Sequence, residues 1–191
     1  MRYQSGHKAE IRQKIVKDAS ERVRAEGLNG AAVSVVMRDA GLTHGGFYKH
    51  FASKDELILE SLREGFREIV DTLVRAAEQS PPGQAWKAIV RAYLRPEMCE
   101  NPEHGCPLAT LGPELARVDK RMKPQIVAEL VNYKSRMVPF MPGRRTADKE
   151  RAFFAIFSTM IGVVEIARLL PDPAMREKVL GNARDFLLRA F

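Results

Sequence analysis

Residues 33–51, VSVVMRDAGLTHGGFYKHF, decide the fold of this chain. The first part, residues 33–40, has apolar side chains at helical spacing and is stopped by Gly41. Thr43 can then cap a second short helix that continues to His50. Two short amphipathic helices joined by a turn that contains glycine predict a helix-turn-helix.

The second of these helices has a polar outer face. Gly45 and Gly46 are poor helix formers, and each costs about 1 kcal/mol relative to alanine in a helix interior. They would allow the start of the helix to approach a DNA backbone closely, or they could simply make room for packing between helices. We favour the DNA interpretation, because the glycines lie among donors suited to phosphates and base edges. The outward set is Thr43, His44, Gly45, Tyr48, Lys49 and His50.

Composition agrees with a polyanionic partner. The formal net charge is +7, and residues 1–54 contain ten Lys or Arg against five Asp or Glu. A merely basic, soluble surface would give the same surplus. With 45% hydrophobic and 29% charged residues, the chain is typical of a globular protein and not of a disordered one.

No membrane or secreted location is indicated. The longest apolar stretch, residues 152–167, is too short to span a bilayer and contains Glu165. The N-terminus does not resemble a signal peptide, and Cys99 and Cys106 are too few for a disulfide framework. We expect a cytoplasmic protein without a membrane partner.

Helical periodicity covers nearly all of the remaining sequence, so we expect an all-α fold with about nine helices. The first should run from Lys8 to Glu26, where Gly27 closes it. A long fourth helix should begin at a capping box, Ser53 to Glu56. The further helices are expected at residues 86–94, from 107 onward with an interruption around 112–113, at 122–137, at 147–170 and after 173.

Two segments resemble the N-terminal domain of the TetR family of transcriptional regulators. They are RQKIVKDASERVRAEGL, residues 12–28, and AGLTHGGFYKHFASKDEL, residues 40–57. The resemblance implies a DNA-binding domain at residues 8–68 and a helical effector-binding and dimerisation domain at residues 69–191. It further implies a homodimeric repressor that a small-molecule effector releases from a palindromic double-stranded DNA operator. No cofactor and no enzymatic activity are implied.

The resemblance also assigns DNA contacts. Thr43 should cap the recognition helix, and Tyr48 and Lys54 should contact phosphate. The family usually places Ser or Thr just before the first short helix, where this chain has Ala31 and Ala32. Ser34 could compensate only if that helix begins later. The predicted DNA-binding residues are Ser34, Thr43, His44, Gly45, Tyr48, Lys49, His50 and Lys54.

The helix expected at residues 147–170 is apolar on nearly all sides, which favours burial against a second subunit. The alternative is a central core helix within one subunit. The predicted dimer interface comprises Phe153, Phe157, Ile161, Val164, Phe186 and Leu187. Aromatic and methionine side chains in this half are candidates for an effector pocket, although such residues more often form plain core. The candidates are Trp86, Tyr93, Cys106, Leu108, Met137 and Phe157.

The segment Gly105-Cys106-Pro107 is similar to one branch of the family and leaves alternatives open. Cys106 at a helix N-terminus would have a lowered thiol pKa and could sense oxidants or electrophiles, with Cys99 as partner. It could also be a small buried side chain, which we favour. A Cys-dependent enzyme using His104 lacks any supporting motif. A protein-binding adaptor would need an apolar face in place of residues 44–50, and the four histidines show no metal-ligand spacing.

Overall fold

The computed structural model describes residues 2–191, with side chains from His7 onward. Over that range the chain contains only helices, which confirms the all-α prediction. The α-helices are α1 (Arg2–Glu26), α2 (Val33–Asp39), α3 (Lys54–Glu78), α4 (Ala85–Tyr93), α5 (Glu97–Glu100), α6 (Pro107–Arg117), α7 (Lys123–Met137), α8 (Thr146–Arg168) and α9 (Pro173–Ala190). The short 3-10 helices are η1 (Leu28–Ala31), η2 (His44–Lys49), η3 (Pro102–His104) and η4 (Val138–Phe140).

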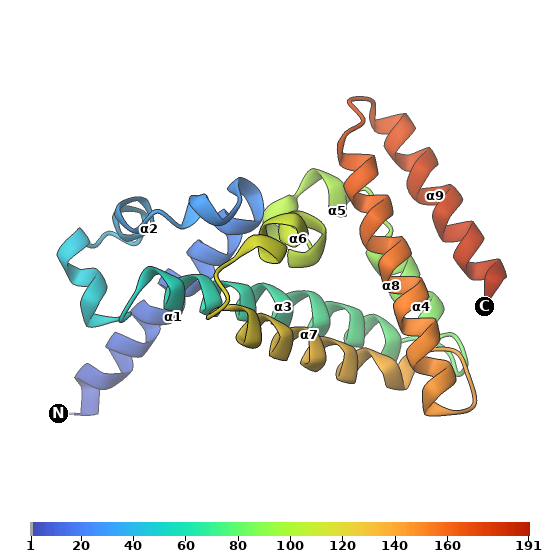
Figure 1. Cartoon of the computed structure of the whole chain (residues 1–191), viewed down its shortest axis with the longest axis horizontal. Coiled ribbons are helices and arrows are strands. Elements are labelled where there is room, and N and C mark those ends of the chain that lie inside the picture. The colour runs from blue at the N-terminus through green and yellow to red at the C-terminus, as the bar shows by residue number, and fades with distance from the viewer. Residues whose placement is uncertain (1) are drawn as a thin grey trace.

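The two ends of the fold are joined by α3. Figure 1 shows α1 and α2 at one end, α8 and α9 at the other, and α7 alongside α3 between them. Three apolar clusters fill the interior, and α3 contributes to all of them. Leu57 packs in the cluster with Ile15 of α1, Leu62 in the cluster with Leu111 of α6, and Leu73 in the cluster around Trp86 of α4. The boundary expected at residue 68 therefore falls within one continuous helix.

The end of α1 depends on Gly27. Its φ is +81°, a backbone conformation that residues with a Cβ rarely adopt. A Cβ at this position would also lie 2.8 Å from the carboxylate of Glu114 on α6. That carboxylate accepts a hydrogen bond from the amide of Leu28 at 2.9 Å. The chain thus leaves α1 in direct contact with α6.

The interruption expected at Gly112 and Pro113 does not occur, because α6 continues through both residues. A proline has no amide hydrogen, so the carbonyl of Ala109, four residues earlier, loses its partner within the helix. The guanidinium of Arg168, from the end of α8, donates to that carbonyl at 2.6 Å. A side chain 59 residues away therefore replaces the missing helical hydrogen bond.

None of the helices in residues 2–191 is long and apolar enough to cross a membrane.

Candidate nucleic-acid interface

The predicted helix-turn-helix is present as α2, a turn and η2. In the turn Gly41 has a φ of +73°, and the amide of Leu42 donates to the carbonyl of Met37 at 2.8 Å. Met37 of α2 and Phe47 of η2 pack in one buried cluster with Ile15 of α1. This cluster fixes both short helices to α1 and leaves their opposite faces outward.

The second element differs from the prediction in its geometry. It is a 3-10 helix and not an α-helix, and the Thr43 side chain makes no capping hydrogen bond. The amide of Gly46 instead donates to the backbone carbonyl of Thr43 at 2.9 Å. The glycine pair explains this short, tight element, since glycine gives little support to a longer α-helix.

The start of α2 is uncapped by any side chain. The helix begins at Val33, so Ala32 occupies the N-cap position and its carbonyl accepts from the amide of Val36 at 3.1 Å. Ser34 lies inside the first turn and therefore does not replace the missing cap. Its side chain is exposed and stays available for an outside partner.

Most of the residues predicted to bind DNA share one exposed region. Tyr48 is 71% exposed, a high value for a tyrosine, while its neighbour Phe47 is 1% exposed. The two rings meet edge to face with centroids 5.3 Å apart. Adjacent residues of η2 thus serve opposite purposes, one in the core and one outside. The exposed residues of the predicted set are Ser34, Thr43, His44, Gly45, Tyr48, Lys49 and Lys54.

His50 departs from this pattern because it is half-buried. Its Nδ1 is enclosed without a hydrogen-bond partner among the described residues. Burial lowers the pKa of His50 below its usual value of 6.5, and the positive charges of Lys8, Arg12 and Lys49 lower it further. The side chain is therefore mostly neutral at pH 7 and offers little positive charge to phosphate.

Arg12, which sequence reasoning did not single out, holds the end of η2 in place. Its Nε donates to the carbonyl of His50 at 3.1 Å, and its Nη2 donates to Glu56 at 3.1 Å. A further ion pair joins it to Glu60, and the guanidinium lies 4.7 Å from the ring centroid of Phe51. The i, i+4 pair of glutamates on α3 was the only signal in the sequence for such a partner.

The capping box at the start of α3 forms with a shift of one residue. The Ser53 hydroxyl accepts from the amide of Glu56 at 3.1 Å, as expected. The Glu56 carboxylate, however, accepts from the amide of Ala52 at 2.6 Å in place of the Ser53 amide. The other oxygen of this carboxylate pairs with Arg12.

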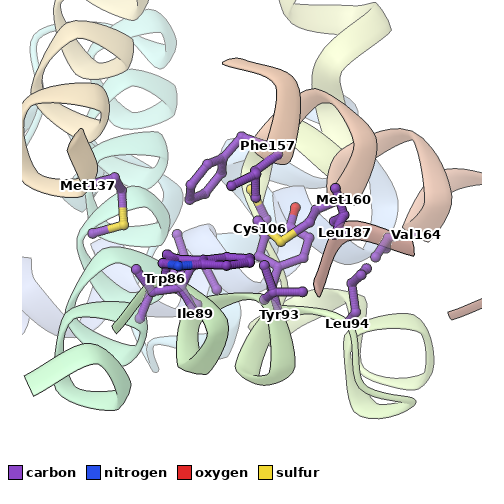
Figure 2. Close-up of a cluster of buried hydrophobic side chains, with 14 of the residues drawn as sticks. Trp86, Ile89, Tyr93, Leu94, Cys106, Met137, Phe157, Met160, Val164 and Leu187 are labelled. Carbon is purple, nitrogen blue, oxygen red and sulfur yellow. The ribbon is translucent and has the colours of Figure 1, made fainter. Parts of the chain in front are cut away.

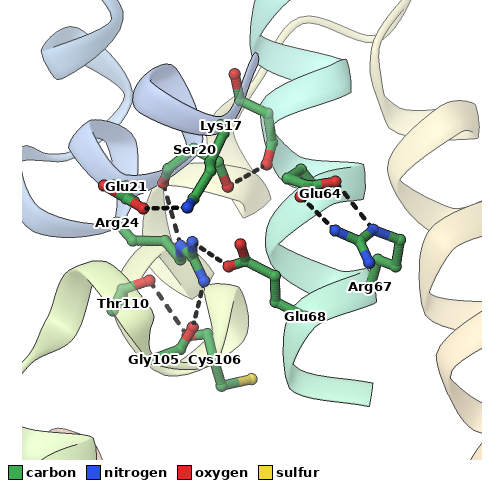
Figure 3. A network of polar contacts seen from close by, with 11 residues as sticks. Lys17, Ser20, Glu21, Arg24, Glu64, Arg67, Glu68, Gly105, Cys106 and Thr110 are labelled. Carbon is green, nitrogen blue, oxygen red and sulfur yellow. Dashed lines mark hydrogen bonds and ion pairs between the residues drawn. The ribbon is translucent and has the colours of Figure 1, made fainter. Parts of the chain in front are cut away.

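Arg24 connects the DNA-binding end to the rest of the molecule (Figure 3). It is 3% exposed and pairs with Glu68 of α3 at 2.6 Å. Its Nη1 donates at 3.2 Å to the carbonyl of Gly105, just before α6, and its Nε donates to Ser20 on α1 at 3.1 Å. A single buried guanidinium thus links α1, α3 and the beginning of α6.

We expect Arg24→Ala to lower the free energy of unfolding by about 2–4 kcal/mol, because it strands Glu68 and the Gly105 carbonyl beside a cavity. Urea unfolding of the purified protein measures this. The matched control is Arg67→Ala, which removes exposed ion pairs on the same helix as Glu68 and should cost less than about 1 kcal/mol. Equal losses in the two variants would contradict a structural role for Arg24.

The predicted effector pocket corresponds largely to a filled core (Figure 2). Trp86, Tyr93, Cys106 and Met137 are buried in that core, each 6% exposed or less. Leu108 and Phe157 are placed differently, because both also line an open groove of 340 Å³ beside α7 and α8.

The lowered pKa that the sensing alternative requires of Cys106 is not found. The thiol is fully enclosed in apolar surroundings, and this burial raises its pKa despite the position at the start of α6. Cys99 also has a pKa raised by burial. Both thiols are free, and the simpler interpretation of Cys106 as a buried core residue fits these observations.

Four of the predicted dimer residues belong to the core of their own subunit, and the prediction is corrected for them. Phe153, Phe157, Val164 and Leu187 are 5% exposed or less because α8 and α9 turn these side chains toward α4, α7 and each other. Ile161 is half-buried, and Phe186 is 62% exposed. Exposed apolar residues on or beside these helices that the sequence pattern did not separate are Phe154, Ile166, Leu169 and Met175.

Comparison with known proteins gives a consistent result. The profile of the family described as bacterial regulatory proteins, tetR family, matches residues 15–61, and no curated protein sequence matches the chain. A TetR transcriptional regulator from Chloroflexus aurantiacus J-10-FL is 20% identical, with a TM-score of 0.77 over 98% of this chain and 97% of that one. SCO4454, a TetR-family regulator from Streptomyces coelicolor, is 20% identical, with a TM-score of 0.74 over 95% and 96%. A TetR-family regulator from Cytophaga hutchinsonii is 17% identical, with a TM-score of 0.75 over 95% of each chain.

The fold and the exposed η2 surface define the class of helix-turn-helix DNA-binding regulators. Within that class, residues 15–61 match the tetR family of bacterial regulatory proteins, and the full-length fold is shared with solved TetR-family regulators. These comparisons give the Cys-dependent enzyme no support.

Proposed function

We propose that the protein is a homodimeric repressor that binds a palindromic operator through η2 of each subunit and leaves it when a small-molecule effector binds. The observation that carries this proposal is the outward face of η2. Tyr48 and Lys49 point away from the core, and Arg12 fixes the end of that helix against α1 and α3. A helix fixed in this way can enter a major groove without first being ordered.

The apolar side chains left on α8 and α9 support the homodimer. Phe154, Ile166 and Phe186 are each more than half exposed, as expected of surfaces that meet a partner. Two copies related by a two-fold axis would present their η2 elements to half-sites about 34–36 Å apart or a multiple of that distance. In this proposal residues 8–68 bind DNA in the cytoplasm, and residues 69–191 dimerise and bind the effector.

The experiment is footprinting of the purified protein on DNA that flanks its own gene, followed by a salt titration of the affinity. We expect a two-fold symmetric footprint and a loss of affinity of several orders of magnitude between about 50 and 200 mM salt. A reporter placed behind the same DNA should be more active when the protein is deleted. Binding that ignores salt, or the lack of any footprint, would contradict the proposal.

A repressor that senses oxidants through Cys106 is not favoured, since the thiol is enclosed and its pKa is raised. The same footprint repeated with a thiol oxidant should be unchanged.

A further inference from the structure

The connection between α6 and α7 is strongly basic. Residues 117–123, RVDKRMK, contain four basic side chains and one acidic side chain. The acidic residue, Asp119, pairs with Arg121 at 3.1 Å, and the other three basic residues form no ion pair within residues 7–191. Their charges are therefore open to an outside partner. The basic loop, as it is called below, consists of Arg117, Lys120, Arg121 and Lys123, which are all exposed.

Met122 anchors the basic loop beside the DNA-binding end of the molecule. Its side chain is buried in one cluster with Val23 of α1 and Ile58 of α3. Ile58 lies about one helical turn after Lys54, the predicted phosphate contact at the start of α3. Figure 1 shows the connection from α6 to α7 passing beside the first turns of α3. The buried methionine thus holds the basic loop near that phosphate contact.

Arg121 lies across a hollow from the start of α3. The hollow has a volume of 380 Å³, and its lining includes Arg121 together with Ser53 and Asp55, the chain neighbours of Lys54. The pKa of Arg121 is raised, chiefly by its hydrogen bond with Asp119 and to a smaller extent by the charge of Asp55. Two carboxylates, those of Asp55 and Glu56, line the same hollow, so its interior does not suit a phosphate. The groups left to reach DNA are the two lysines of the loop, which are not part of the lining.

The stability of α7 does not account for these lysines. The helix begins at Lys123 and has no acidic residue in its first turn. Positive charge there meets the positive end of the helix dipole, where Asp or Glu would be favourable. An anionic partner outside the chain would offset this repulsion.

We propose that the basic loop extends the DNA-binding surface, and that Lys120 and Lys123 pair with backbone phosphates close to the phosphate reached by Lys54. This rests on the proposed function, because the α2–η2 unit must first be docked on DNA. Such contacts add affinity without reading sequence, since every base pair presents the same phosphates. Part of the half expected to bind the effector would then also hold the DNA.

The test is a salt titration of the affinity for the footprinted DNA, with the full-length protein and the double variant Lys120→Gln/Lys123→Gln. Each lost phosphate contact makes the slope of log K against log salt shallower by about 0.9, and a dimer loses each contact twice. We therefore expect a slope shallower by about 2–4, and an affinity at least tenfold lower at about 100 mM salt. Affinity for unrelated DNA of the same length should fall by the same factor.

The matched control is the double variant Arg91→Gln/Arg144→Gln. It removes two exposed positive charges near the other end of α3, so the net charge changes equally while the basic loop stays intact. The salt slope of this control should match that of the unmodified protein. The thermal stability of the lysine double variant should be unchanged or slightly higher, because it removes repulsion at the start of α7.

An intact footprint with an unchanged salt slope in the lysine double variant would overturn the proposal, and the loop would be a solvated surface or a contact for an acidic protein. An equal change of slope in the control would also overturn it, because net charge alone would then explain the effect. A loss confined to the operator, with unrelated DNA bound as before, would contradict contacts to phosphate. The proposed function fails separately, if the unmodified protein gives no footprint, and this proposal would then fail with it.

Discussion

Replacing Phe47 by alanine is expected to lower the free energy of unfolding by about 3–5 kcal/mol. The ring is 1% exposed and stacks on Phe51, with centroids 5.4 Å apart, in the cluster that holds η2 against α1. Its loss leaves a cavity that the short η2 helix cannot refill without moving. Urea unfolding followed by circular dichroism measures the change.

The neighbouring residue provides the control. Tyr48→Ala removes a ring that is 71% exposed, so its cost in stability should stay within about 1.5 kcal/mol, the worth of the aromatic pair with Phe47. If Phe47→Ala were no more destabilising than Tyr48→Ala, the N-terminal cluster would not be the element that fixes η2.

Tyr48→Ala should instead reduce affinity for the operator by roughly 100-fold or more. A base or phosphate contact of this kind contributes about 1–3 kcal/mol, and a dimer loses it in both half-sites. Fluorescence anisotropy with a labelled fragment from the footprinted region measures the loss at fixed salt concentration. Sedimentation of the variant should match that of the unmodified protein, because Tyr48 lies far along the chain from α8 and α9.

Tyr48→Phe separates the ring from the hydroxyl. It should lose affinity only in part if the hydroxyl donates to phosphate while the ring packs on the DNA. Unchanged operator affinity in Tyr48→Ala would show that η2 does not enter the groove as proposed.

Most helix ends could be predicted from periodicity and punctuation, but α1 begins at Arg2, six residues before the predicted Lys8. Gly27, Gly41 and the prolines around residue 171 mark real ends, because each acts through its own backbone or that of its neighbours. The exposed and buried sides of η2 could also be predicted from residue type. Burying Tyr48 would leave a hydroxyl in need of a hydrogen bond, whereas Phe47 has no polar group.

Contacts between distant segments could not be predicted. The continuity of α6 through Pro113 depends on Arg168. The position of η2 against α1 and α3 depends on Arg12 and two glutamates of α3. Such pairs are separated by tens of residues, and nothing in local spacing points to them. For the same reason the apolar pattern of α8 predicted that the helix is mostly buried. It did not distinguish the side chains that face the core of their own subunit from Phe154, which is exposed.

The hydrogen bonds around α6 have a mechanical consequence. Polar bonds hold this 11-residue helix just before its start, in its first turn and near its end: Arg24 to Gly105, Arg168 to Ala109, and Glu114 to Leu28. Such a helix cannot slide along its axis without straining bonds to Arg24 of α1 and Arg168 of α8 at its start, and the bond to Leu28 near its end. A shift of the last turn of α8 is therefore transmitted through α6 to the C-terminal end of α1 as a rigid displacement, and apolar packing does not absorb it.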